Sequence, residues 1–163
     1  MSDLGDLQRI LDRASQALPE KLPRIIEVEG LNFIKMNFRK QGYTDTSFTK
    51  WQDRKKDDTR GRDKTRYRTN RVGSRGELTK FGQREQGRAI LVGHRTGGNK
   101  LINSFRARRS RQRVVFYTYK DYASDHNEGS GNLPKRQFFG KSQYLDRKIQ
   151  DKVTREMDRI MRG

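Results

Sequence analysis

The sequence predicts an α+β fold, with N-terminal and C-terminal helices packed on a small, mostly antiparallel β-sheet and a long basic loop or arm. Three observations predict it. Apolar residues recur at three- and four-residue spacing near both ends of the chain, as they do in amphipathic helices. The run at 114–119 (VVFYTY) is β-branched and aromatic, which favours a strand. Much of the middle of the chain is basic and poor in apolar residues.

Length and composition indicate one domain. The chain has 163 residues, enough for one domain with its own core. Only 30% of the residues are hydrophobic and 36% are charged, so we expect a small core beneath a highly charged surface. We divide the predicted domain, 1–163, into N-terminal helices (1–42), a basic extended arm (43–88), and the sheet, motif loop and C-terminal helix (89–163).

The composition also excludes several classes of protein. The chain has no Cys, which excludes disulfides, thiolate zinc sites and cysteine nucleophiles. Its apolar runs are only a few residues long, and a membrane span needs ~20 apolar residues. Its first residues do not show the pattern of a signal peptide, so we expect none.

Two helices are predicted before residue 42. The apolar stripe of the first consists of Leu4, Leu7, Leu11, Ala14 and Leu18, with Ser2 or Asp3 as its cap. Pro19 and Pro23 then interrupt the chain, and the second helix is expected to begin near Pro23, because proline is favoured in a first turn. Its apolar face consists of Ile25, Val28, Leu31, Ile34 and Phe38. It is expected to stop at Gln41 and Gly42.

The segment 43–88 is the predicted arm. Its apolar residues are sparse, and clusters such as 54–56 (RKK) and 60–62 (RGR) lie between them. Such a composition is typical of a segment with few regular elements. Two interpretations stay open: a solvated, mobile loop, or an ordered arm that faces nucleic acid or a neighbouring subunit.

Regular elements are expected again after the arm. The first is a short apolar run at 89–92. A turn then leads into a short helix or strand near 101–105. An antiparallel hairpin follows, which has a basic turn and 114–119 as its second strand. A short helix at 122–127 is closed by Gly129, and a flexible loop follows at 129–133. Ser142 caps the last helix, whose stripe consists of Leu145, Ile149, Val153, Met157 and Ile160.

The positive charge is concentrated in the middle of the chain. The formal net charge is +18, and residues 50–113 hold 21 Lys and Arg against 6 Asp and Glu, a net of +15. Such charge favours a polyanionic partner, nucleic acid before a membrane surface, although basic ribbons also meet acidic faces of neighbouring subunits. The candidate DNA- or subunit-facing residues are Arg66, Arg68, Arg71, Arg106, Arg108, Arg109, Arg111 and Arg113.

One cluster has the residue types of a catalytic site. Asp125, His126 and Glu128 form the only His–carboxylate cluster. A general base is conceivable there, but neither a nucleophile nor a phosphate-binding motif accompanies it, and the Gly-rich stretch 93–98 does not match a P-loop. His94 is too distant in sequence for a helical zinc motif. We therefore expect a structural His126, no catalytic residues, no metal ligands and no cofactor.

Two motifs in the C-terminal half resemble those of the phage virion morphogenesis, or tail completion, family. YASDHNEG at 122–129 is similar to its YAxxHNxG-like element, and LPKRQFFG at 133–140 is similar to its PxRxFxG element, which a terminal helix follows. Upstream, Trp51 resembles the Trp that follows the N-terminal helix, and an apolar run, a TG element and a hairpin keep the family's order. The resemblance covers about residues 30–162, and the motif residues are Tyr122, Ala123, His126, Asn127, Gly129, Pro134, Arg136, Phe138 and Gly140.

The resemblance implies a structural virion protein of a tailed phage, not an enzyme. Such a tail completion or head-tail joining subunit is assembled in the host cytoplasm into a neck or tail-end ring around the DNA channel, with six copies as the first expectation and twelve as the second. The implied partners are further copies of the chain, other neck, connector and tail-tube proteins, and genomic DNA through non-specific contacts. No membrane partner is implied.

The motif residues have fold-forming roles in that setting. Pro134 and the glycines set a tight return of the chain, and Phe138 packs under the terminal helix. Arg136 donates to carbonyls or a carboxylate at a corner, while His126 and Asn127 satisfy backbone groups at the end of the short helix.

Two other classes of function stay open. One is a basic nucleic-acid-binding protein of ribosomal or nucleoid type that acts as a monomer or dimer, with binding that depends steeply on salt. The other is a nuclease-like enzyme that uses His126.

Overall fold

A computed structural model describes residues 4–53, 77–84, 88–92 and 98–162, and its architecture confirms the α+β class. Its elements are α1 (Leu4–Lys40), β1 (Gly42–Thr44), β2 (Phe48–Lys50), α2 (Lys80–Arg84), α3 (Leu101–Ser104), β3 (Phe105–Arg109), β4 (Val114–Thr118), α4 (Ala123–Glu128) and α5 (Gln143–Arg162). Within the described residues the strands form two separate antiparallel pairs, β1–β2 and β3–β4, in place of the one small sheet that the sequence predicts.

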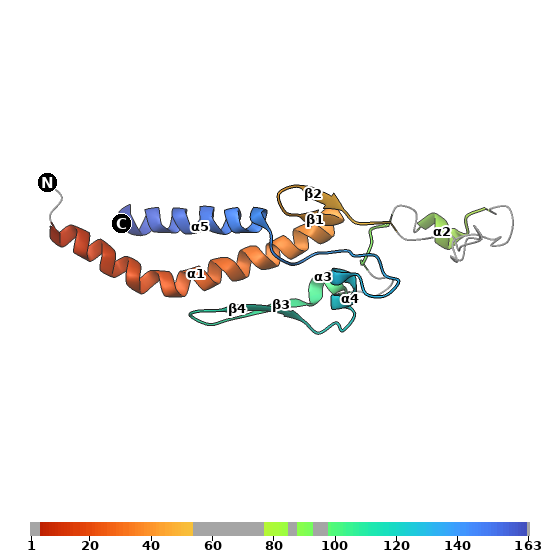
Figure 1. Cartoon of the computed structure of the whole chain (residues 1–163), viewed down its shortest axis with the longest axis horizontal. Coiled ribbons are helices and arrows are strands. Elements are labelled where there is room, and N and C mark those ends of the chain that lie inside the picture. The colour runs from red at the N-terminus through yellow and green to blue at the C-terminus, as the bar shows by residue number, and fades with distance from the viewer. Residues whose placement is uncertain (1–3, 54–76, 85–87, 93–97, 163) are drawn as a thin grey trace.

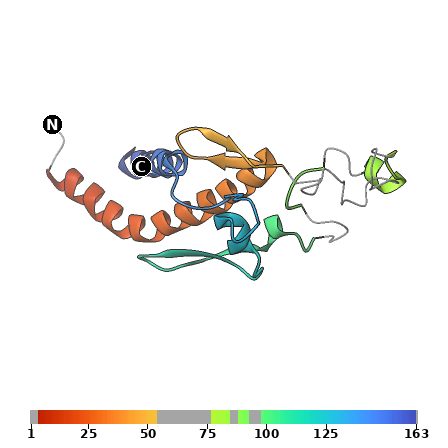
Figure 2. The ribbon, with the colours of Figure 1, turned by 45° about the vertical axis from the view of Figure 1, so that its right-hand side comes forward.

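The long helix α1 forms the middle of the structure. α5 runs along one side of it, and the β3–β4 hairpin lies along the other (Figures 1 and 2). The C-terminal helix therefore packs chiefly on α1 and not directly on the hairpin. Within the described residues, no helix is long and apolar enough to cross a membrane.

The prediction of two N-terminal helices is wrong, because α1 is continuous through Pro19 and Pro23. Each proline removes one backbone hydrogen bond, which bends a helix but ends it only when nothing else holds the two halves. α1 is visibly bent (Figures 1 and 2), and α5 packs along it at this point. Lys21, between the two prolines, pairs with Glu156 of α5, and Pro23 is buried.

The apolar stripes of α1 are only partly buried. Ala14 is buried, as are Ile34 and Phe38 further along the helix. Leu11 and Val28, predicted to lie on the apolar faces, are 54% and 47% exposed. Since α5 and the hairpin each cover one side of α1, positions between the two remain open to solvent.

The core lies at the C-terminal end of α1. Phe38 contacts the rings of Trp51, Phe105 and Phe138, with centroids 5.3, 5.9 and 5.1 Å away. Ile34, Ile90, Leu101 and Ala123 complete the buried cluster. Segments from the whole length of the chain thus meet at one aromatic side chain.

The predicted arm, 43–88, begins too early. Its first residues form the β1–β2 hairpin, and Tyr43 and Trp51 are buried. At its other end lie α2 and the buried Ile90, just beyond the predicted boundary. Residues 54–76, the most basic part of the predicted arm, lie outside the described residues, so the arm itself stays a prediction.

Gln41 ends α1, as predicted, and joins both flanks of the arm. Its φ of 57° is left-handed, which stops the helix. Its carbonyl accepts the N–H of Trp51 at 2.8 Å, its side-chain amide donates to the carbonyl of Ile90 at 3.3 Å, and its Oε1 accepts the Ile90 N–H. One residue therefore holds the chain where it leaves the core and where it returns.

The β3–β4 hairpin confirms the prediction of an antiparallel pair with a basic turn. Ala107 lies opposite Phe116, and the Phe116 ring packs on α1 at Gly30. A Cβ at position 30 would overlap that ring. Glycine is therefore required at this point of a helix, where it otherwise lowers stability.

We predict that Gly30→Ala destabilises the protein. Alanine favours the helix by up to about 1 kcal/mol, but overlap with Phe116 costs roughly 1–3 kcal/mol, so a net loss of about 1 kcal/mol is expected in urea denaturation. In a Phe116→Leu background the same change should cost less, because leucine has no ring to overlap the new Cβ. An equal cost in both backgrounds would contradict the close contact.

Candidate functional site: the motif segment and the basic hairpin

The short helix α4 ends as the sequence predicts. Gly129 adopts a left-handed φ of 79°, and its N–H donates to the carbonyl of Asp125 at 2.9 Å. A Cβ at position 129 would lie 2.9 Å from the backbone nitrogen of Lys135. Glycine is thus needed both for the turn and for the close approach of the returning chain.

The two sequence motifs form one hydrogen-bonded unit. The Asn127 side-chain oxygen accepts the N–H groups of Phe138 and Phe139, at 3.0 and 3.1 Å. The Arg136 N–H donates to the carbonyl of His126 at 2.7 Å, and its buried guanidinium donates to the carbonyl of Gln52 at 3.2 Å. Asn127 and Arg136 therefore satisfy backbone groups, as predicted, although Asn127 serves the returning chain and not the end of α4.

The returning chain is also tied to α1 and to the β1–β2 hairpin. Asn37 of α1, fully buried, donates to the carbonyl of Phe138 at 3.1 Å. The indole N–H of Trp51 donates to the carbonyl of Gln137 at 2.7 Å, and Tyr43 donates to that of Lys141 at 2.8 Å. Ser142 donates to the Thr44 carbonyl and accepts the Leu145 N–H, which confirms it as the cap of α5.

The remaining motif residues also lie in this unit, with one correction. Ala123 is buried in the core, and Gly140 has a φ of 154° next to the side chain of Gln137. Pro134 is half-buried in the return. Phe138 packs against Phe38 and Phe105, with ring centroids 5.1 and 5.2 Å away, not under the C-terminal helix as predicted. It does so because the return passes the end of α1 before α5 begins.

His126 is half-buried beside the exposed ring of Tyr122, whose centroid is 6.0 Å away. Its Nδ1 is buried and has no hydrogen-bond partner among the described residues. Burial lowers the pKa of His126, and the nearby Arg136 guanidinium lowers it further, while Asp125 raises it. The neutral imidazole is the form that this environment favours.

A cluster of metal ligands is absent from the described part of the chain. That part holds no group of three or more His, Asp or Glu side chains that could bind a metal ion. Asp125 and Glu128 are exposed on α4, and Glu128 accepts a hydrogen bond from Asn127. His94 lies outside the described residues.

The hairpin places the predicted arginines on different faces. Phe105, Ala107 and Arg109 alternate with Arg106 and Arg108, which share the outer face with Tyr117 and Val115 on the opposite strand. The Ser110 N–H donates to the Arg113 carbonyl at 2.8 Å and closes the turn. All five arginines of β3 and the turn are exposed: Arg106, Arg108, Arg109, Arg111 and Arg113.

Two of these five arginines have partners within the chain. Arg109 pairs with Glu27 of α1 at 3.1 Å. Arg106 donates to the carbonyls of Asn103 and Phe105, both at 2.8 Å. The Arg108, Arg111 and Arg113 guanidiniums have no such partner among the described residues. Arg66, Arg68 and Arg71 lie outside the described residues, and their predicted role stays a prediction.

Sequence reasoning missed two residues that shape these sites, Asn37 and Tyr117, and missed the side-chain hydrogen bonds of Gln41. Asn37 lies three positions after Ile34 on the buried face of α1, and a polar residue at such a position is a signal that could have been used. Gln41 gives no comparable signal. The exposure of Tyr117 follows from strand alternation, since it lies on the face opposite to Phe116.

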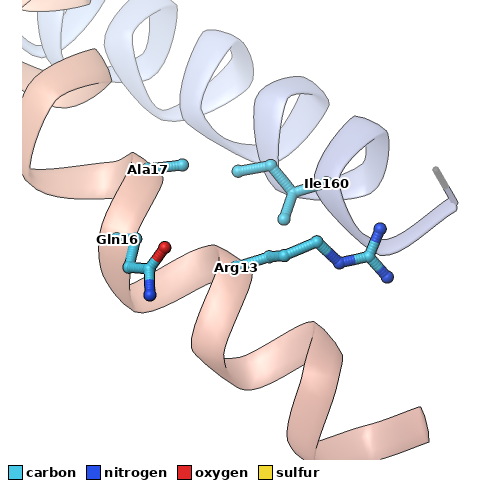
Figure 3. A pocket seen from close by; sticks show the side chains of 4 residues that line it. All are labelled: Arg13, Gln16, Ala17 and Ile160. Atoms are coloured by element: carbon cyan, nitrogen blue, oxygen red, sulfur yellow. The ribbon is translucent and has the colours of Figure 1, made fainter.

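A shallow pocket lies between the free ends of α1 and α5. Figure 3 shows its lining, Arg13, Gln16 and Ala17 from α1 and Ile160 from α5. It combines one exposed cation with small apolar surfaces and holds no buried polar group aimed into it. It lies at the far end of α1 from the motif unit and the core (Figure 1).

Comparison with known proteins identifies no relative: no family model, no curated protein and no solved structure matches this chain.

We predict that Asn127→Ala destabilises the protein by about 2 kcal/mol or more, because it leaves two N–H groups of the return without their acceptor. Asn127→Asp keeps an oxygen at the same place and should retain most of the stability. Urea denaturation of both variants gives the comparison. Equal losses in the two would show that the side-chain oxygen does not hold the return.

We predict that stability falls as the pH is lowered from about 7.5 to 5. The folded-state pKa of His126 lies below its unfolded value of about 6.5. The unfolded chain therefore binds more protons in this range, and stability is lost as the pH falls below the unfolded pKa. His126→Gln, measured by thermal denaturation across the same range, should show a flatter profile. Parallel profiles for the two proteins would rule out this role of His126.

Proposed function

We propose that this chain is a structural subunit of a tailed-phage virion, a tail completion or head-tail joining protein that assembles into a ring at the neck or tail end. The observation that carries the proposal is the unit formed by YASDHNEG and LPKRQFFG. The resemblance in sequence lies in these two motifs, and in the structure they bind one another through Asn127 and Arg136. The motifs therefore serve as a scaffold, which is what an assembly protein needs.

One further feature supports an assembly role. Leu11 and Leu22 on α1 are 54% and 38% exposed, and their spacing of eleven residues puts them on nearly the same side of the helix. Exposed apolar side chains of this kind are suited to contacts between subunits. A closed ring needs two different surfaces on each subunit, because its contacts are head-to-tail.

A second candidate is a basic nucleic-acid-binding protein that acts as a monomer or dimer. The observation that favours it is the exposed outer face of β3–β4, which carries Arg108 and Arg113 on the same side as Tyr117. The two candidates differ in assembly: the first gives a ring that is part of a particle, and the second never enters one.

The test is genetic and structural. A nonsense mutation in the gene should give full heads and tails that fail to join, or tails that end incorrectly, seen by electron microscopy. Mass spectrometry of purified wild-type particles should find the chain in several copies. Normal, infectious particles without this chain would refute the proposal.

A matched pair of variants sharpens this test. Asn127→Asp should restore joined particles, and Asn127→Ala should restore fewer, in proportion to the folded protein that remains. His126→Gln should also restore them, because the proposal gives His126 no catalytic role. If a folded His126→Gln variant fails to join particles and has also lost a measurable nuclease activity, the enzyme is favoured instead.

A further inference from the structure

The outer face of the β3–β4 hairpin carries positive charge and no negative charge. No Asp or Glu occurs between Lys100 and Asp121, and all five arginines of β3 and the turn are exposed. The structure removes Arg109 from this set, because it faces α1 and pairs with Glu27. Arg106 bends back onto the carbonyls of Asn103 and Phe105.

Three arginines are then left to bind something outside the chain. Arg108 lies opposite Val115, and Arg113 is two residues before Val115, on the same face of the ribbon. Such diagonal neighbours are roughly 7–8 Å apart. Arg111 extends the row into the turn. This row of unpartnered guanidiniums, Arg108, Arg111 and Arg113, is called the arginine row below.

From this arrangement we propose that the arginine row, with Tyr117 further along the same face, binds the phosphate backbone of duplex DNA without reading its sequence. A strand of five residues is about 17 Å long, and duplex DNA carries about ten phosphate charges over that length. The rigid side-chain fork of arginine suits phosphate oxygens, and tyrosine hydroxyls also donate to them. This proposal rests on the proposed function in one respect: a neck or tail-end ring is what would bring DNA next to the subunit.

The tyrosines favour a duplex over a single strand. Single strands bind by stacking bases on free aromatic faces. Tyr119, beyond the end of β4, is 58% exposed, but the Lys120 ammonium lies 5.1 Å from its ring centre and its hydroxyl donates to the Asn99 side chain at 3.3 Å, so part of the ring is already in use. Within β4, Tyr117, 47% exposed, is the one aromatic ring on the outer face, and a single stacking surface is too little for a strand of several bases.

The underside of the hairpin holds the row in place. Phe116 packs on α1 at Gly30 and on Phe139, 5.0 Å between ring centres, and Arg109 pairs with Glu27 near the turn. The ribbon is thus fixed to α1 along its length, with α5 on the other side of that helix (Figure 1). A polyanion can approach the row without meeting α5.

The test compares two variants with the same change of charge. In the first, Arg108, Arg111 and Arg113 are replaced by Gln; in the control, Arg147, Arg155 and Arg162, exposed on α5, are replaced by Gln. Binding to a mixed-sequence duplex is followed by fluorescence anisotropy between 50 and 200 mM salt. Thermal denaturation checks that both variants fold, as expected, since neither set has a partner in the described chain.

The row variant should bind the duplex about tenfold more weakly or worse at low salt, and its slope of log affinity against log salt should fall by about 0.9 per lost contact, roughly 2.7 in all. The control should lose much less. A single strand of the same length should bind the wild type more weakly than the duplex. No binding by the wild type, equal losses in the two variants, or tighter binding of the single strand would overturn the proposal.

A separate measurement distinguishes DNA from an acidic protein surface. Light scattering reports the oligomeric state of both variants. If the row variant loses self-association and keeps duplex binding, the row is a subunit contact and the DNA proposal fails, while the assembly function stands. If the row variant loses duplex binding but the chain is absent from particles, the DNA proposal stands and the assembly function fails.

Discussion

The contact of Phe38 with Trp51, Phe105 and Phe138 is the interaction on which the rest of the structure depends. A chain with 30% hydrophobic residues can build only a small core, and this one is built where α1 ends. A buried phenylalanine side chain contributes roughly 1.5–3 kcal/mol. Because each ring comes from a different part of the chain, loss of this contact would release the β1–β2 hairpin, β3 and the motif segment together.

Polar side chains hold the return at 134–142 in place, which the small apolar core does not do alone. The return at 134–142 has no helix or strand, so its backbone groups need other partners. Asn127 accepts two of its N–H groups, and Asn37 and Trp51 donate to two of its carbonyls. These bonds explain why a motif rich in polar residues lies against an aromatic cluster: the polar residues take the place of a neighbouring strand.

The sequence pattern predicted those elements that are held together by residues close in sequence. The stripe and serine cap of α5, the β3–β4 hairpin and the Gly129 stop of α4 all depend on residues close in sequence, and all were predicted. The prediction that the helix breaks at Pro19 and Pro23 was wrong, because α5, which lies far along the chain, supports α1 there. The three-residue strands β1 and β2 are too short for a periodic signal. Partners such as Arg136 and Gln52, 84 residues apart, leave no trace in a local pattern.

The division of the hairpin arginines shows why net charge alone assigns no function. Alternation along β3 turns Arg109 toward Glu27, where its charge serves to hold the ribbon on α1. The same alternation turns Arg108 outward, where its charge has no partner in the described chain. Removal of the Arg109 charge therefore breaks a half-exposed ion pair worth at most about 1 kcal/mol, whereas removal of the Arg108 charge affects only the proposed binding. One face of the ribbon packs on α1 and the other carries Arg108 and Arg113, so packing and the proposed contact with a polyanion can be separated by mutation.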